Sequence, residues 1–172
     1  MSYPANFTML KRGYGVTDAA HTVEKYPIGA TFTDEKGNVF EYVKTASAVS
    51  IGVSEAVILL AAGAQSVTTT LAAATGSRIG VAMVAVTAIT STVQYLWVQT
   101  KTGAGQVGSI SVAVSCAAYA GLGTTATAGV LDDALSVGKV YGITINTAVT
   151  SAAVSTNAII SYPYVFPTFA TS

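Results

Sequence analysis

Side chains that could catalyse a reaction or bind a metal are few in this sequence. His21 is the only histidine and Cys116 the only cysteine. His21 has Asp18 and Glu24 nearby, but acid–base catalysis or metal binding needs further partners at a defined geometry. Cys116 lies in the small-residue stretch SVAVSCAAYA and cannot form an internal disulfide. We therefore expect His21 to be a solvated residue and Cys116 to fill a small apolar space.

Two other patterns resemble ligand-binding motifs. Asp132 and Asp133 are adjacent, but calcium takes six or more oxygen ligands, and a turn or a strand end is the favoured interpretation. The stretch GAGQVG (103–108) has spaced glycines, yet a phosphate-binding loop needs a strand followed by a helix. A Ser-His-Asp or Cys-His set is not recognisable either. We expect no enzymatic activity, no metal and no cofactor.

Charge is scarce and balanced along the chain. Charged residues make up 9% of the 172 residues, and eight basic side chains offset eight acidic ones. Residues 1–44 hold ten of these sixteen charges, so the later surface depends on Thr, Ser, Asn and Gln. Nucleic-acid binding needs a clustered basic surface, which the sequence does not offer. A neutral, charge-poor surface favours association with other protein, and we expect a homo-oligomer, with a trimer favoured.

A membrane span is not expected. The most apolar stretch, ASAVSIGVSEAVILLAAGA (46–64), approaches the length of a spanning helix but carries Glu55 at its middle. A central acid costs about 3 kcal/mol on insertion scales. The start of the chain, MSYPANFTMLKRG, lacks the continuous apolar core of a signal peptide.

Short β-branched stretches separated by glycines favour an all-β sandwich or barrel-like domain. ATFTDEKGNVFEYVK (30–44) predicts a hairpin with Gly37 at its turn, and KTGAG (101–105) predicts a second hairpin between its flanking strands. Residues 78–90, KVYGITINTAVT (139–150) and NAIISYPYVF (157–166) predict further strands.

The boundaries follow from where this pattern starts and stops. We expect an extended N-terminal arm at 1–27, a β-rich domain at 28–160, and an aromatic, proline-containing C-terminal tail at 161–172. Residues 54–63 fit either a short helix or a buried strand, and their β surroundings favour the strand. A similarity between 78–91 and 139–151 leaves an internal duplication open.

Aromatic side chains are the best candidates for an interface. Tyr95 and Trp97 would point to one face of a strand. That pair can anchor the core, or it can face a neighbouring subunit, where aromatic residues are enriched. The aromatic rings of the two arms should dock on their own body or on a neighbour, because exposing them to water costs free energy. These rings belong to Tyr3, Phe7, Tyr162, Tyr164, Phe166 and Phe169.

Three stretches carry a resemblance to a known family. They are YPIGATFTDEKGNVFEYVKTASAVSIG, IGVAMVAVTAITSTVQYLWVQTKTG and LGTTATAGVLDDAL with the later VYGITI. Together they resemble the small head decoration, or cement, proteins of tailed bacteriophages, over roughly residues 27–150. Both predicted arms lie outside the resemblance, and no catalytic residue comes with it.

The resemblance implies a structural virion protein on the outer surface of an icosahedral capsid. Such a protein binds and bridges major capsid subunits, commonly as a trimer. The alternative is another assembly subunit, such as a tail or fibre component, a major capsid subunit or a surface-layer-like protein. A major capsid subunit would ordinarily be longer and a surface-layer protein would carry a secretion signal, so capsid decoration is the favoured hypothesis.

Overall fold

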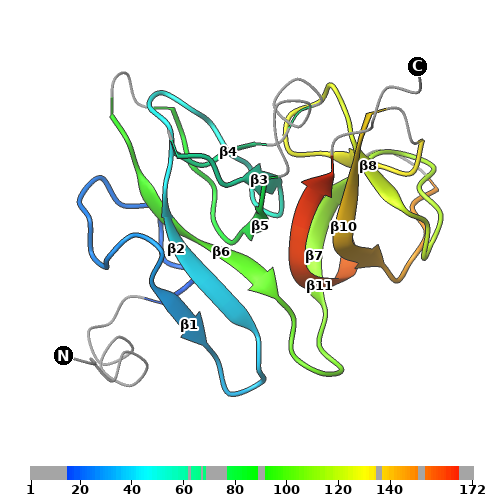
Figure 1. Ribbon diagram of the computed structural model, residues 1–172, viewed down its shortest axis with the longest axis horizontal. Helices are drawn as coiled ribbons and strands as arrows, with labels where there is room; N and C mark the ends of the chain where they lie inside the picture. The colour runs from blue at the N-terminus through cyan, green and yellow to red at the C-terminus, as the bar shows by residue number, and fades with distance from the viewer. Residues whose placement is uncertain are drawn as a thin grey trace.

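Every regular element in the described part of the chain is a β-strand, which confirms the all-β class (Figure 1). The computed structural model describes residues 15–61, 63–66, 68, 77–88, 92–134, 137–150 and 154–166. The strands are β1 (Thr31–Thr33), β2 (Val39–Lys44), β3 (Ala56–Ile58), β4 (Gln65–Ser66), β5 (Ile79–Ala82), β6 (Tyr95–Lys101), β7 (Gly108–Val112), β8 (Leu122–Thr124), β9 (Leu131–Asp132), β10 (Val137–Ile145) and β11 (Val154–Phe166).

The strands form two lobes that lie side by side (Figure 1). In the sheet lobe, β1 to β6 pair antiparallel in the order β4-β3-β5-β6-β2-β1. In the barrel lobe, β7 to β11 pair in a closed ring, β7-β11-β10-β8-β9, and β9 returns to β7 as a parallel neighbour. Closure leaves the barrel lobe without a free sheet edge.

The first predicted hairpin is confirmed. β1 and β2 pair antiparallel with Phe32 opposite Phe40. Gly37 in the turn has a φ of 83°, in the left-handed region that favours glycine. The Asp34 carboxylate accepts hydrogen bonds from the backbone N–H groups of Lys36 and Asn38, both at 2.9 Å. These local bonds lower the pKa of Asp34, against the opposing effect of its burial.

The second predicted hairpin is wrong, because β6 and β7 do not pair with each other. β6 already has β2 along one edge and β5 along the other. With both edges filled, the chain leaves the sheet lobe after Lys101, turns through Gly105 (φ 69°), and begins the barrel lobe with β7. β7 then pairs with β11, which is more than forty residues away in the sequence.

The ambiguous stretch at 54–63 forms the buried strand β3, as its surroundings favoured. The strand expected at 78–90 is confirmed only as the shorter β5, which is buried throughout. Gly80 of β5 packs against Val98, and a Cβ added there would lie 2.5 Å from Val98 Cγ2. Its counterpart in the suggested duplication, Gly142 of β10, instead has a φ of 80°. The two matched glycines therefore serve different backbone conformations.

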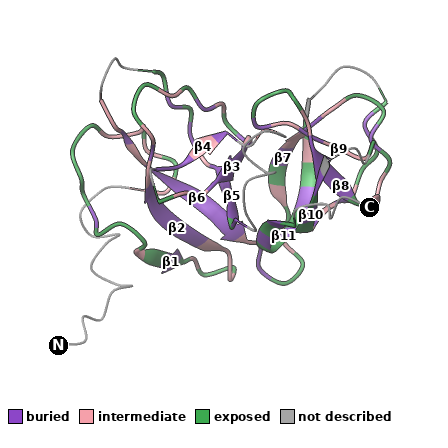
Figure 2. Cartoon of the chain, turned by 45° about the horizontal axis from the view of Figure 1, so that its top comes forward, coloured by how far each residue is buried: buried purple, intermediate pink, exposed green. Residues whose placement is uncertain are grey.

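One apolar core joins the two lobes. Ile110, Leu131 and Ile160 from the barrel lobe pack in the same buried cluster as Ile58 and Ile79 from the sheet lobe. Backbone hydrogen bonds reinforce this junction, running from Ser111 N to Ser54 O at 2.8 Å and from Ala56 N to Gly129 O at 2.9 Å. Figure 2 shows buried residues on both sides of the junction. The shared core makes the relative position of the lobes a consequence of packing.

Both predicted domain boundaries shift in the structure. β11 continues to Phe166, so the boundary at residue 160 falls inside a strand and residues 161–166 belong to the barrel lobe. Part of the predicted N-terminal arm docks on the sheet lobe. His21 and Tyr95 exchange backbone hydrogen bonds of 2.9 and 2.8 Å, and Tyr26 is buried against the sheet. Residues 1–14 and 167–172 lie outside the described residues.

Candidate interaction surface

Four aromatic side chains form an exposed row on the outer face of β10 and β11, which we call the aromatic stripe. Tyr141, Tyr162, Tyr164 and Phe166 are 44%, 59%, 43% and 42% exposed. The rings of Tyr141 and Tyr164 stack with centroids 5.3 Å apart, and Phe166 meets Tyr141 edge-on at 6.4 Å. Figure 2 shows exposed residues along these two strands. Large apolar rings gathered on a surface are typical of a protein interaction site.

A β-bulge turns these rings outward. Along β11, Ala158 and Ile160 point into the barrel, and strict alternation would place residues 162, 164 and 166 inside as well. The pairing of β10 with β11 instead shifts register between Tyr141 and Ile143. Ser161 and Tyr162 are consequently both exposed, and Pro163 and Val165 become the inward residues. Residues 161–163 of β11 thus lie opposite the single residue Gly142 of β10, and this irregularity moves the aromatic half of β11 from the core to the surface.

Three of the interface residues predicted from the sequence lie together in the aromatic stripe, namely Tyr162, Tyr164 and Phe166. Tyr141 was not predicted, although its position two residues before Ile143 in an alternating strand gave a weak signal. Tyr3, Phe7 and Phe169 fall outside the described residues. Strand pairing therefore adds Tyr141 to the three residues that the sequence indicated.

Trp97 and Tyr95 lie elsewhere, in the sheet lobe. Trp97 is only 4% exposed, and its ring centroid lies 5.1 Å from that of Tyr42 and 5.3 Å from that of Tyr26. Tyr95 is half-buried and stacks on Tyr42 at 6.0 Å. Both residues therefore anchor an aromatic core cluster, which was one of the two interpretations of this pair. A buried Trp97 cannot contact a neighbouring subunit without a rearrangement of this core.

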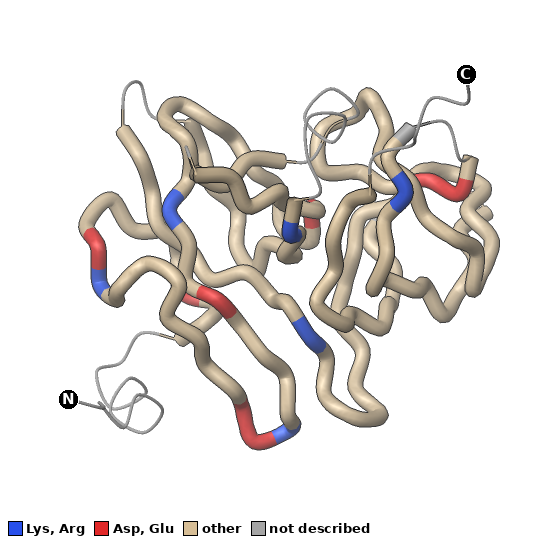
Figure 3. The backbone as a smooth tube through the Cα atoms, in the orientation of Figure 1, with Lys and Arg blue, Asp and Glu red and all other residues tan. Residues whose placement is uncertain are grey.

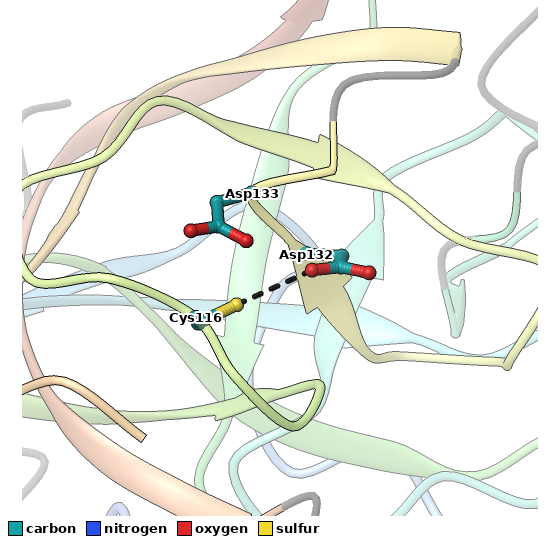
Figure 4. A group of neighbouring side chains, drawn as sticks. All are labelled: Cys116, Asp132 and Asp133. Atoms are coloured by element: carbon teal, nitrogen blue, oxygen red, sulfur yellow. Dashed lines mark hydrogen bonds between the residues drawn. The ribbon is translucent and has the colours of Figure 1, made fainter. Parts of the chain in front are cut away.

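Cys116, Asp132 and Asp133 form the one group of potential metal ligands in the described residues (Figure 4). Their ligand atoms lie within 4.8 Å of one another, and Cys116 Sγ is 3.5 Å from Asp132 Oδ1. Asp133 accepts a 2.8 Å hydrogen bond from Ala117 N, and Asp132 accepts one of 3.3 Å from Ala134 N. Both carboxylates thus fix the backbone of adjoining turns, as expected for residues at the end of a strand.

Burial, aided by Asp132, raises the pKa of the Cys116 thiol from its ordinary 9.0 to about 11. Between these two values the unfolded chain releases the thiol proton and the folded chain retains it, so rising pH favours unfolding. We expect the free energy of unfolding to fall by at most about 2 kcal/mol across this window.

Urea unfolding measured between pH about 8 and about 10.5 tests this expectation, with Cys116→Ala as the comparison. The variant should lose stability with pH less steeply than the wild type, since tyrosine ionisation is common to both. Parallel pH profiles would contradict the assigned thiol pKa.

An ion pair within the sheet lobe joins Arg78 to Glu41 of β2, and the backbone of Arg78 also bridges to Tyr164 of β11. The Arg78 guanidinium donates to both carboxylate oxygens of Glu41, at 2.8 and 2.9 Å, and this pairing raises the pKa of Arg78. The Glu41 side chain is 9% exposed and that of Arg78 is 67% exposed. Shallow hollows of about 330 and 320 Å³ lie on either side of the pair. Arg78 therefore covers a carboxylate that would otherwise be buried without a counter-charge.

The described residues contain no helix that is long and apolar enough to cross a membrane. Comparisons with family models, with curated proteins and with solved structures found no match to this chain. The interaction surface described above is therefore the basis for assigning a function.

Proposed function

We propose that this chain is a structural virion protein that decorates and stabilises an icosahedral phage capsid by binding major capsid subunits. The aromatic stripe is the observation that carries the proposal. Four rings, each more than 40% exposed, lie together on a rigid barrel whose strands have no free edge. Rigid aromatic anchors contribute strongly to protein interfaces, because they bury a large area at a low cost in conformational entropy.

Sparse charge also supports a role in assembly. Only six of the sixteen charged side chains lie beyond residue 44, so most of the later surface can be covered by protein without stripping water from ions (Figure 3). The resemblance of residues 27–150 to head decoration proteins turns this general assembly role into a specific one. Under this proposal the protein lies on the outer capsid surface.

Binding to purified heads that lack the protein tests the proposal. The double substitution Tyr141→Ser with Tyr164→Ser removes the stacked pair of the stripe, and we expect it to weaken head binding by at least about tenfold. Wild-type protein should also raise the temperature at which heads release DNA. Sedimentation of labelled protein with heads measures the first effect, and a dye-release melt measures the second.

Tyr119→Ser is the matched control, because Tyr119 is 71% exposed on the barrel lobe and is not part of the stripe. It should bind heads as the wild type does. Equal loss in both variants would show that the stripe is not the contact surface. Wild-type binding to tails or fibres, with none to heads, would instead support the alternative assembly role.

A further inference from the structure

β1 forms an open edge of the sheet lobe. Among the described residues it pairs only with β2, and Figure 1 shows it at the outer border of the lobe. Ala30 O accepts a 2.8 Å hydrogen bond from β2, and Asp34 N donates a 3.0 Å hydrogen bond to the residue that precedes β2. Because bonding alternates along an antiparallel strand, the backbone N–H and C=O groups of Thr31 and Thr33 point away from β2, toward the open edge.

The two faces of this edge differ in chemistry. Thr31 and Thr33 are both exposed, and their side chains lie on one face of β1. Phe32 lies on the other face, where its ring centroid is 6.2 Å from that of Phe40 and 6.4 Å from that of Trp97. A strand added to this edge should therefore place apolar side chains beside Phe32 and polar side chains beside the two threonines.

The described chain begins beside the same aromatic cluster. Val16 packs against the cluster that contains Phe32, and so does Ala30, which precedes β1. The preceding residues 1–14 include the stretch Asn6-Phe7-Thr8-Met9, in which polar and apolar side chains alternate. The chain between residues 9 and 16 can span about 20 Å when extended. This stretch is therefore long enough and close enough to reach the open edge of β1.

We propose that residues 6–9 of the same chain add to β1 as an antiparallel strand. Phe7 lies opposite Phe32 in this register, and its neighbour Thr8 lies opposite Thr31. Both apolar side chains of the segment then cover the aromatic cluster, and both polar ones lie on the threonine face. The antiparallel direction brings the end of the segment to the start of β1, from which the link to the described chain is shortest.

The added strand would give the outward N–H and C=O groups of β1 their hydrogen bonds. It would also cover an edge that is otherwise able to pair with a strand of another molecule. The barrel lobe has no such edge, because its strands close into a ring. The proposal does not depend on the capsid role.

Hydrogen exchange in the full-length chain tests the added strand. The amides of Thr31 and Thr33 should be protected in the wild type, because they donate to the segment. Phe7→Ser places a polar side chain on the aromatic cluster, and we expect both amides to exchange at least about tenfold faster in this variant. Tyr3→Ser is the matched control, since Tyr3 precedes the proposed strand and its loss should leave exchange unchanged. The amide of Phe32 faces β2 and reports whether β1 itself stays folded.

A disulfide identifies the chain that supplies the strand. Thr8→Cys with Thr31→Cys should link within one chain at least about tenfold faster than Thr8→Cys with Thr127→Cys, because residues paired across two strands lie within disulfide distance. Thr127 is exposed on the barrel lobe and gives the matched control. Cys116 is buried and stays in place in both variants. A non-reducing gel of thiol-blocked samples separates linked monomers from linked dimers.

Two results of the exchange experiment would overturn the proposal, namely unprotected Thr31 and Thr33 amides in the wild type and protection that survives Phe7→Ser. Equal linking rates in the two cysteine pairs would overturn it as well. A disulfide between two chains would assign the edge to the segment of a neighbouring copy, against docking within one chain. Failure of the wild type to bind heads would overturn the capsid role but leave this proposal standing.

Discussion

Replacing Trp97 with alanine is expected to lower the free energy of unfolding by about 3–5 kcal/mol, the range for a fully buried large aromatic residue. The indole packs against the rings of Tyr26, Phe32 and Tyr42. Removing it leaves a cavity among rings that β2 and β6 hold in fixed positions. Urea unfolding followed by tyrosine fluorescence or circular dichroism measures the loss.

Trp97→Phe is the informative control. The indole N–H of Trp97 is buried and has no hydrogen-bond partner in the described residues. Phenylalanine keeps much of the ring packing and removes this unsatisfied donor, whose burial costs about 1–3 kcal/mol. We therefore expect Trp97→Phe to cost less than about 2 kcal/mol. A Trp97→Ala variant that unfolds like the wild type yet no longer self-associates would support the interface interpretation of this residue.

Local signals in the sequence were sufficient for the first hairpin but not for the second. In DEKGN, one glycine at positive φ and one aspartate that caps the turn fix the pairing of β1 with β2. KTGAG also makes a turn, but whether its flanking strands pair depends on which edges remain free. β6 pairs with β2 along one edge and with β5 along the other. The residues around the turn at 103 do not indicate either pairing.

The barrel lobe shows the same limit more strongly. The strands expected at 139–150 and 157–166 are present as β10 and β11, because their β-branched residues and alternation are local features. Their closure into a ring depends on β9, which is only two residues long and pairs with β7 through Val112 and Leu131. A strand this short carries no periodicity, so only the three-dimensional packing reveals it.

The interaction surface was predictable in kind but not in position. The cost of exposing aromatic rings drew attention to Tyr162, Tyr164 and Phe166, which were placed in a tail. The structure places them in a strand of the barrel lobe, and Tyr141 joins them through its pairing with Tyr164. A bulge reverses which residues of β11 face outward, and hydrophobic alternation alone gives the opposite face.

Gly142 controls this bulge, and Gly142→Ala is expected to cost about 2–4 kcal/mol of unfolding free energy. Its φ of 80° is unfavourable for alanine, and an added Cβ would lie 2.5 Å from Ser161 O and 3.0 Å from Pro163 Cα. Both atoms belong to the backbone, so the clash can be relieved only by moving β11 relative to β10. Urea unfolding measures the cost.

Gly105→Ala is the control that separates the cost of a positive φ from the cost of a steric clash. Gly105 has a similar φ of 69°, but a Cβ there meets nothing within 4 Å, so its substitution should cost only about 1 kcal/mol. The difference between the losses of unfolding free energy in Gly142→Ala and Gly105→Ala then measures the tight contact between Gly142 and β11. Because the same contact sets the outward turn of Tyr162, folded Gly142→Ala protein should also bind heads more weakly, whereas Gly105→Ala protein should not. Equal stability loss at the two glycines, with head binding retained in both, would show that the bulge can shift without disturbing the aromatic stripe.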